Sequence, residues 1–183
     1  MAGEPTYEAL LQRVRNLEKV LAEKDRKEKA LQRRILALTQ PRDSTAEGLE
    51  LEDLFDMDDI QCLQDEFARA TGVASIITRV DGSPITHPSN FCRLCEKIIR
   101  KTEKGFANCC KSDAALGKLS SDGPIIQPCM SGGLWDAGAG ISISGRHIAN
   151  WLIGQVRDET QTEENMCAYA RTIGVDEAIM VEA

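Results

Sequence analysis

The sequence predicts an α+β protein in which a long coiled-coil helix precedes a sheet flanked by helices. Apolar residues repeat at heptad spacing over residues 7–38, and helical and strand-like patterns alternate after residue 49. The pairs Asp81-Gly82 and Ser144-Gly145 each stand between apolar, strand-like runs. Such pairs are typical of tight turns between antiparallel strands, which predicts a sheet in the second part of the chain.

The apolar residues of the first segment follow alternating steps of three and four. They are Tyr7, Leu10, Val14, Leu17, Leu21, Leu31, Ile35 and Leu38. Lys24 and Glu28 occupy the two positions between Leu21 and Leu31, where polar residues lower stability and can set register. Because so narrow a stripe does not stabilise a lone helix, we expect residues 1–40 to form a homodimeric coiled coil. The alternative is a helix that packs on its own domain.

Pro41 and its polar neighbours end this helix, so we predict a linker over residues 41–48 and a globular domain over residues 49–183. Residues 1–40 carry nine Lys and Arg against six Asp and Glu, whereas residues 41–183 carry thirteen against twenty-three. An acidic domain repels phosphate groups, so we expect no nucleic-acid partner.

No stretch of the sequence approaches the roughly 20 apolar residues that span a membrane. The N-terminus also lacks the apolar run of a signal peptide. We therefore expect no membrane partner and a cytoplasmic location. In that compartment thiols stay reduced, so clustered cysteines favour metal or redox chemistry over structural disulfides.

The domain is predicted to open with a helix, a strand and a turn. Asp56 is a good N-cap and Gly72 a good C-terminal stop, and the expected buried stripe consists of Ile60, Leu63 and Phe67. Residues 73–80 read as a strand, and Pro84 to Thr86 as the start of a returning strand.

The remainder is predicted as two helices, strands and a final helical region. Ser89 or Asn90 caps a helix that runs through Ile99, and Thr102 caps another that runs through Leu119. Further predicted elements are a strand over 124–127, a hairpin over 139–156, a helix capped by Thr162 with Met166, Tyr169, Ala170 and Ile173 inward, and a helix from Asp176. We expect this last helix to be cut short by the end of the sequence.

Five of the seven cysteines lie between Cys92 and Cys129. Cys92 and Cys95 form a C-x2-C pair that can chelate one ion, Cys109 and Cys110 follow one helix later, and Cys129 comes from a strand. Four soft ligands suit tetrahedral zinc or an iron–sulfur cluster, and the spacing does not decide between them. We predict Cys92, Cys95, Cys109 and Cys129 as metal ligands, with Cys109 preferred over its neighbour because adjacent helical residues point to different sides.

The cysteines are also compatible with two roles that involve no metal. Each could be a small buried hydrophobe, which accounts well for the isolated Cys62 and Cys167. Alternatively, Cys92 at a helix start could act as the nucleophile of a thiol–disulfide oxidoreductase, with Cys95 as the resolving thiol. Apart from that possibility we expect no enzyme in this chain, because His87 and His147 belong to no recognisable catalytic triad.

Several segments, taken in order, resemble the PocR sensory domain, a PAS-like ligand-binding module of prokaryotic signalling proteins. The resemblance spans about residues 50–183. It is carried by Leu51 to Gln61, Gly72 to Thr78, Asp81 to Ile85, Asn90 to Leu94, Gly105 to Cys109, Ser112 to Ala114, Cys129 to Leu134, Gly154 to Val156 and Arg171 to Glu177. The chain departs from the family pattern at Met130, where the family often has histidine, and over residues 137–141, which lack a common proline.

The resemblance implies a PAS-like mixed or antiparallel sheet flanked by helices, with a cavity on one face. It also implies a small-molecule ligand, simple alcohols and diols among the candidates, and an output module of the histidine kinase (two-component system) or transcription-factor type. We expect Met130, Trp135 and Asp136 to line the pocket. The function predicted is thus a cytoplasmic sensory domain that detects an organic molecule or a redox state beside the cysteine cluster. The alternatives are the oxidoreductase above and a dimeric scaffold without a sensing role.

Overall fold

The structure, a computed structural model, describes residues 6–39 and 50–183. The chain divides into two compact units, Met1–Leu49 and Glu50–Ala183. The predicted linker over residues 41–48 lies outside the described residues. In the first unit, the described residues form one helix, α1 (Tyr7–Thr39), as the heptad pattern predicts. Its apolar stripe is exposed, with Leu17 61% and Leu31 58% accessible.

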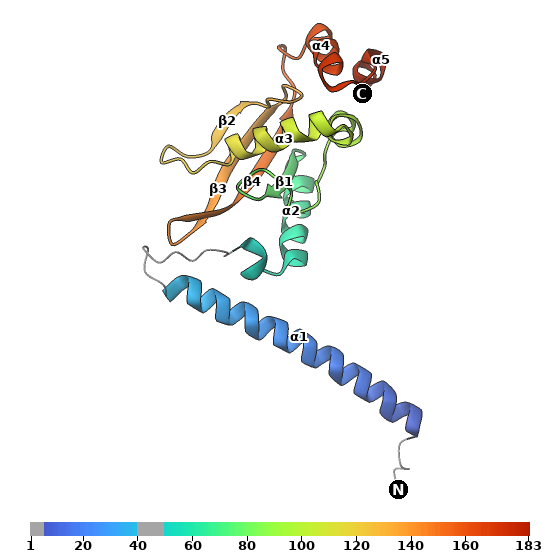
Figure 1. The fold of residues 1–183 in the computed structure, drawn as a ribbon, viewed down its shortest axis with the longest axis vertical. Coiled ribbons are helices and arrows are strands. Elements are labelled where there is room, and N and C mark those ends of the chain that lie inside the picture. Colours follow the sequence, from blue (N-terminus) through green and yellow to red (C-terminus); the bar gives the residue numbers. More distant parts are fainter. Residues whose placement is uncertain (1–5, 40–49) are drawn as a thin grey trace. The chain divides into compact units, whose positions relative to one another are not determined.

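The second unit is built on a four-stranded sheet that is antiparallel throughout. The strands β1 (Ala74–Thr78), β2 (Ile125–Pro128), β3 (Trp135–Ile143) and β4 (Arg146–Val156) have the order β1-β4-β3-β2. The predicted α+β class is therefore confirmed, with helices on both sides of the sheet (Figure 1). Among the described helices, none is long and apolar enough to cross a membrane.

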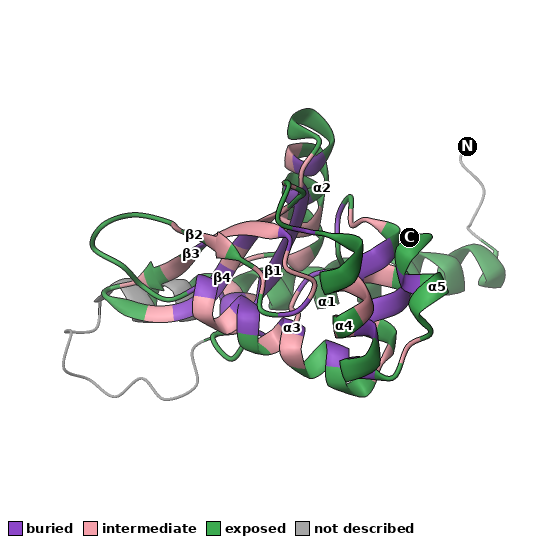
Figure 2. Cartoon of the chain, turned by 90° about the horizontal axis from the view of Figure 1, so that it is seen from above, coloured by how far each residue is buried: buried purple, intermediate pink, exposed green. Residues whose placement is uncertain are grey.

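The two faces of the sheet have different neighbours. On the inner face, Ile76 of β1 and Leu152 of β4 are paired in register and pack with Leu116 of helix α3 (Glu103–Leu116). On the outer face, Trp151 of β4 contacts Phe67 of helix α2 (Met57–Thr71), with ring centroids 5.9 Å apart. Alternation of side chains along each strand explains the division. Buried residues concentrate on β1, β4 and the sheet-facing side of α3 (Figure 2).

Glycines on β3 let the C-terminal end of α3 lie directly on the sheet. A Cβ on Gly138 would stand 2.6 Å from Leu152 Cδ2 and 2.7 Å from the Leu116 carbonyl oxygen. Likewise, a Cβ on Gly140 would stand 2.9 Å from the Gly117 carbonyl oxygen. These glycines alternate with alanines that face outward. The stretch of β3 over residues 137–140, Ala-Gly-Ala-Gly, therefore has no side chains on its inner face.

The helix caps predicted at Asp56, Thr102 and Thr162 are confirmed. The Asp56 side chain accepts a hydrogen bond from Asp58 N at the start of α2, which ends at Gly72 in the left-handed conformation. Thr102 and Thr162 cap α3 and α4 (Glu163–Ile173) in the same way. These ends depend on groups within three residues, which is why the sequence alone predicts them.

Other boundaries were predicted wrongly. The helix expected from Ser89 or Asn90 begins instead as a π-helical turn, η2 (Leu94–Ile98), followed by the 3-10 turn η3 (Ile99–Lys101). Ser89 is held in an antiparallel bridge to Ser75, and Asn90 has a φ of 54°, so neither can start a helix. The long-range pairing with β1 overrides the local capping preference.

Strand and helix lengths also differ from prediction. β3 begins at Trp135 instead of 139, because Pro128 and Trp135 pair across the turn after β2. α3 ends at Leu116 instead of 119, because Gly117 lies against Asn150 on the sheet. The strand expected at Pro84 is reduced to a single bridge to Thr78.

The buried face of α2 contains a polar residue that the predicted stripe missed. Leu63 is 54% exposed, whereas Gln64 is fully buried. The Gln64 side-chain amide donates to the Ser75 and His87 carbonyls and to the Ser89 hydroxyl, and it accepts from the Thr86 hydroxyl. Gln64 thus fastens the segment after β1 to both α2 and the sheet.

The C-terminal helices share a second apolar core with the segment that precedes α3. Leu94, Ile98 and Ile99 pack with α4 and with α5 (Glu177–Val181), which contributes the buried Met180. Cys109 of α3 belongs to the same cluster. This core connects the sheet-covering helix to the end of the described chain.

We expect Gly138→Ala to lower the free energy of unfolding by about 1–3 kcal/mol, since the added methyl group overpacks the contact between α3 and the sheet. Urea denaturation measures the change. Gly132→Ala is the matched control, because its Cβ would meet only the end of the Ile99 side chain, at 3.1 Å. Equal stability of Gly138→Ala and the wild type would contradict the assigned contact.

Candidate functional site

A small chamber lies between the middle of α3 and the inner face of the sheet, and we call it the cysteine chamber. Its volume is about 30 Å³. Its lining includes Phe91, Cys95, Arg100, Cys109, Asp113, Cys129, Asp136, Leu152 and Gln155. The three cysteines come from η2, α3 and the turn after β2. The fold thus brings together thiols that are up to 34 positions apart, Cys95 to Cys129.

Most thiols of the chamber are held in the protonated form. Burial raises the pKa of Cys109, and it raises that of Cys129 to about 11, with the nearby Asp136 carboxylate adding to the effect. The pKa of Cys95 is raised because its thiol donates a hydrogen bond to Cys92, and burial raises it further. These three thiols therefore carry their protons at neutral pH.

Cys92 is the exception. The hydrogen bond from the Cys95 thiol lowers its pKa to about 6 against the effect of burial, and backbone N–H groups at Cys95 and Leu94 assist. This shift favours the thiolate form of the half-buried Cys92. The irregular π-helical turn places the sulfurs of Cys92 and Cys95 together. It also leaves the backbone N–H groups of Leu94 and Cys95 directed at the Cys92 sulfur.

A buried ion pair forms one wall of the chamber. Arg100 Nη2 lies 2.7 Å from Asp113 Oδ2, and the two side chains are only 11% and 8% exposed. The Arg100 guanidinium also stacks over the Phe91 ring, 5.1 Å from its centroid. Because Asp113 neutralises it, Arg100 does not offer a free charge to an anionic ligand.

Strand β4 contributes a strained residue to the chamber. Gln155 has a φ of 61°, a conformation uncommon outside glycine. Its backbone N–H donates to Asp136 Oδ1 at 2.7 Å, and its side-chain Oε1 accepts from Cys92 N at 2.7 Å. Gln155 therefore links the Cys92 turn to Asp136, whose pKa burial raises to about 6.

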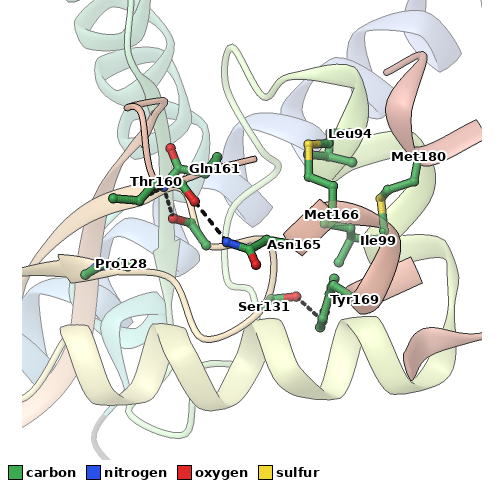
Figure 3. A pocket seen from close by; sticks show the side chains of 12 residues that line it. Leu94, Ile99, Pro128, Ser131, Thr160, Gln161, Asn165, Met166, Tyr169 and Met180 are labelled. Atoms are coloured by element: carbon green, nitrogen blue, oxygen red, sulfur yellow. Dashed lines mark hydrogen bonds between the residues drawn. The ribbon is translucent and has the colours of Figure 1, made fainter. Parts of the chain in front are cut away.

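A second, larger cavity of about 290 Å³ lies beside the chamber, and we call it the C-terminal cavity. It is lined by Leu94, Ile99, Pro128, Ser131, Gly132, Gly133, Thr160, Gln161, Asn165, Met166, Tyr169 and Met180. Figure 3 shows the apolar side chains of η2, η3, α4 and α5 gathered at one side and the polar side chains of residues 160–165 at the other. Ser131 and Tyr169 meet between them.

The turn from Cys129 to Gly133 forms the common wall of the two cavities. Cys129 lines the chamber, and Ser131 to Gly133 line the C-terminal cavity. Ser131 Oγ accepts a hydrogen bond from Cys109 Sγ at 3.4 Å and shares another with the Tyr169 hydroxyl at 2.5 Å. Ser131 therefore contacts a residue from each cavity.

The predicted site residues are only partly brought together. Cys95, Cys109, Cys129 and Asp136 line the chamber, and Cys92 adjoins it through Cys95. Met130 is 53% exposed, and it lines neither of the two cavities. Trp135 also lies outside both, where its indole N–H donates to the Asp158 carboxylate.

Several lining residues were missed by the sequence reasoning. Arg100 and Asp113 look like ordinary charged helix residues, and only tertiary packing buries them together. Tyr169 was predicted to face inward but without a role in a site. Ser131 could have been found, because a Ser-Gly-Gly turn two residues after a cysteine favours a close backbone approach.

The sulfurs of Cys92, Cys95, Cys109 and Cys129 are the donors of the predicted metal site. Four cysteine sulfurs are the right chemistry for zinc or an iron–sulfur cluster. Within the ranges 6–39 and 50–183, however, no three His, Cys, Asp or Glu side chains are placed to hold a metal ion. Ligation would require the four sulfurs to draw together and release protons.

Comparison with known proteins assigns the family. Residues 53–183 match the family model described as the sensory domain found in PocR. The chain belongs to the PocR sensory domain family. A curated relative is the Regulatory protein PocR of Salmonella typhimurium (strain LT2), which is 31% identical over 106 residues, 57% of this chain and 34% of that protein. The matched part thus spans about a third of that relative's length. No solved structure matches the chain.

The family match confirms the resemblance seen in the sequence. It covers every element of the PocR sensory domain that lines either cavity, from β1 to α5, and leaves α1 outside. Sensory signalling is therefore the setting in which the two cavities are to be understood.

The lowered pKa of Cys92 predicts a distinctive pH dependence. In metal-free protein, the rate of Cys92 alkylation by iodoacetamide should fall to half its plateau near pH 6 as the thiolate is protonated, and mass spectrometry of the labelled peptide measures it. Cys95→Ala removes the donor hydrogen bond, so the midpoint should move up toward that of a free thiol, roughly pH 8.5. An unchanged midpoint in Cys95→Ala would show that the hydrogen bond does not stabilise the thiolate.

Proposed function

We propose that this PocR sensory domain detects a small organic molecule or a redox state at its two adjoining cavities, within a longer protein of the histidine kinase or transcriptional regulator type. The observation that carries the proposal is the shared wall between the C-terminal cavity and the cysteine chamber. The name of the Salmonella relative, a regulatory protein, supports an output in regulation. We propose no enzymatic reaction for this chain.

Of the two adjoining cavities, volume favours the larger one as the site of an organic ligand. The cysteine chamber, at about 30 Å³, has room for about two water molecules, since each needs roughly 10–15 Å³. The C-terminal cavity, at about 290 Å³, is close to the lower end of the range for ligand pockets, roughly 300–1,000 Å³. We therefore assign the organic ligand to the C-terminal cavity and the redox or metal chemistry to the cysteine chamber.

The elements that line the C-terminal cavity suit signal transmission. α4 and α5 contact the rest of the unit around this cavity and through the apolar core that adjoins it. A ligand that binds one arrangement of these helices better than another shifts the population toward it. The helices would then pass the change to the output module.

We also propose that Cys92, Cys95, Cys109 and Cys129 bind zinc or an iron–sulfur cluster. Their common location and soft donor chemistry support this, whereas their described positions require movement before they could ligate. Zinc would hold the chamber together, and a cluster would respond to oxygen or redox state.

The lowered pKa of Cys92 favours one alternative function, a thiol–disulfide oxidoreductase with Cys92 as nucleophile and Cys95 as resolving thiol. Insulin reduction that disappears in Cys92→Ser would support it. Against it stands the hydrogen bond of Cys92 N to Gln155, which ties this turn to the sheet.

The exposed stripe of α1 supports a homodimer formed through a coiled coil. Sedimentation velocity of the whole chain should give the mass of two chains, and Leu17→Lys should shift the boundary toward one chain because it buries a charge in the seam. A wild-type chain that sediments as a monomer at all concentrations would contradict this proposal.

The metal proposal predicts that anaerobically purified protein contains stoichiometric iron with a broad visible absorbance, or one colourless zinc per chain. Serine substitution at any of the four proposed ligands should lower the metal content severalfold, since one donor is lost. Cys110→Ser and Cys62→Ser are matched controls and should keep it. Metal-free wild-type protein, or equal loss in the controls, would contradict the assignment.

The ligand proposal predicts that filling the C-terminal cavity abolishes stabilisation by ligand. In a thermal-shift screen of small organic compounds, a ligand at 100 times its Kd should stabilise the wild type by about 2.7 kcal/mol. Gly132→Leu should remove this gain, because the new side chain occupies the cavity. Lys118→Leu, which adds an apolar side chain at an exposed site, should keep it. Equal stabilisation of Gly132→Leu would place the ligand elsewhere.

A further inference from the structure

The side chains that line the C-terminal cavity carry no formal charge. Within the described residues, its lining includes no Asp, Glu, Lys, Arg or His. A charged ligand would lose its hydration there without gaining a counter-ion, which costs several kcal/mol. The cavity therefore selects against anions and cations.

Three hydroxyl groups stand in the cavity wall. Thr160 Oγ1 donates to Asp158 Oδ1, and the other two share one hydrogen bond. Ser131 Oγ and the Tyr169 hydroxyl oxygen are 2.5 Å apart, and either can be the donor (Figure 3). Each hydroxyl has one hydrogen. Whichever donates, the other keeps a hydrogen, and within the described part of the chain neither hydroxyl has a further acceptor.

Outside groups already donate to both oxygens. Asn108 Nδ2 donates to the Tyr169 hydroxyl at 3.3 Å, and Cys109 Sγ donates to Ser131 Oγ at 3.4 Å. The hydroxyl that accepts the shared bond thus receives two hydrogen bonds, which fill its two lone pairs. This part of the wall therefore offers a ligand one hydroxyl hydrogen and one lone pair.

Of the two side-chain amides in the wall, Gln161 is fully engaged, whereas Asn165 keeps one N–H and its Oδ1 without a partner among the described residues. Gln161 Nε2 donates to the Gly133 carbonyl at 2.7 Å, and Asn165 Nδ2 donates to the Thr160 carbonyl at 3.1 Å. The remaining lining is hydrocarbon and thioether, with Met166 and Met180 among it. Methionine side chains adapt to the shape of a ligand and contact aromatic rings favourably.

We infer that the C-terminal cavity takes a compact, uncharged organic molecule with a hydrogen-bond-accepting oxygen, such as an aryl or cyclic ketone. The oxygen accepts from the unused hydroxyl hydrogen of the Ser131–Tyr169 pair, and the hydrocarbon part lies against Met166 and Met180. This ligand class presupposes the proposed function and narrows it from organic molecules in general to neutral acceptors.

Three probes of similar shape test the inference. Acetophenone carries the acceptor, ethylbenzene replaces it with hydrocarbon, and benzoate replaces it with a charge. Binding is followed in the whole chain through the ¹³C-methyl NMR signals of Met166 and Met180, assigned with Met→Leu variants. We expect acetophenone to shift both signals and to bind about tenfold more tightly than ethylbenzene, the effect of one hydrogen bond. Benzoate should bind more weakly than either.

Substitutions at the hydroxyl pair give a signature that a structural role would not produce. Ser131→Ala and Tyr169→Phe each leave one hydroxyl hydrogen free, so each should keep acetophenone binding within about threefold of the wild type. The double variant removes the donor and should lose about tenfold in acetophenone affinity, with ethylbenzene unaffected. Ser120→Ala combined with Ser121→Ala removes two hydroxyl groups at exposed sites and should change nothing.

The outcomes separate this inference from the proposed function. If ethylbenzene and acetophenone shift the methionine signals with equal affinity, the cavity still binds organic molecules but the donor role is overturned. If the double variant binds acetophenone as the wild type does, the donor role is overturned as well. If none of the three probes shifts either methionine, both the ligand class and the choice of this cavity are wrong. Circular dichroism melting of each variant verifies that it is folded.

Discussion

The contact of α3 with the sheet at Gly138 and Gly140 is the constraint on which the rest of the domain depends. Without side chains on this stretch of β3, the backbone of the helix end comes within van der Waals distance of the strands. Farther along the sheet, the positions that face the helix are occupied by Asp136 and by Gly154 beside the strained Gln155. There the space between helix and sheet becomes the cysteine chamber instead of an apolar core. The pattern of side chains along the inner face of the sheet thus produces both the tight contact with α3 and the cysteine chamber.

The chamber and the C-terminal cavity divide the chemistry between them. The chamber holds three protonated thiols and a neutralised ion pair in a volume too small for an organic ligand, and Cys92, whose pKa is lowered, adjoins it. The larger cavity has uncharged walls and one unused hydroxyl donor. Because the Cys129–Gly133 turn belongs to both, a change in either cavity can move the same backbone. Under the proposed function, this shared backbone couples the state of the thiols to the occupancy of the C-terminal cavity.

The family assignment fits this division. The match to the PocR sensory domain covers the strands, α3 and the C-terminal helices, which together line both cavities. The helix α1 lies outside the match and has a different design: an exposed apolar stripe at heptad spacing and charged residues on the other faces. Under the proposed function, a signal received in the domain passes through the helices at its boundaries. Movements of helices are a common form of conformational switch.

Much of the architecture was determined by the sequence alone. Several elements follow from residues within a few positions of each other, so the sequence predicts them without a structure. They are the helix caps at Asp56, Thr102 and Thr162, the heptad stripe of α1 and the β3–β4 hairpin. The clustering of the cysteines was visible in the same way. Only the tertiary structure decided that Gln64 is buried while Leu63 is exposed, that Ser89 pairs with β1, and that Ser131 joins Tyr169 and Cys109. These depend on partners between 11 and 38 positions away, Gln64 to Ser75 and Ser131 to Tyr169. Local propensity contains no information about which distant group will satisfy a buried polar atom.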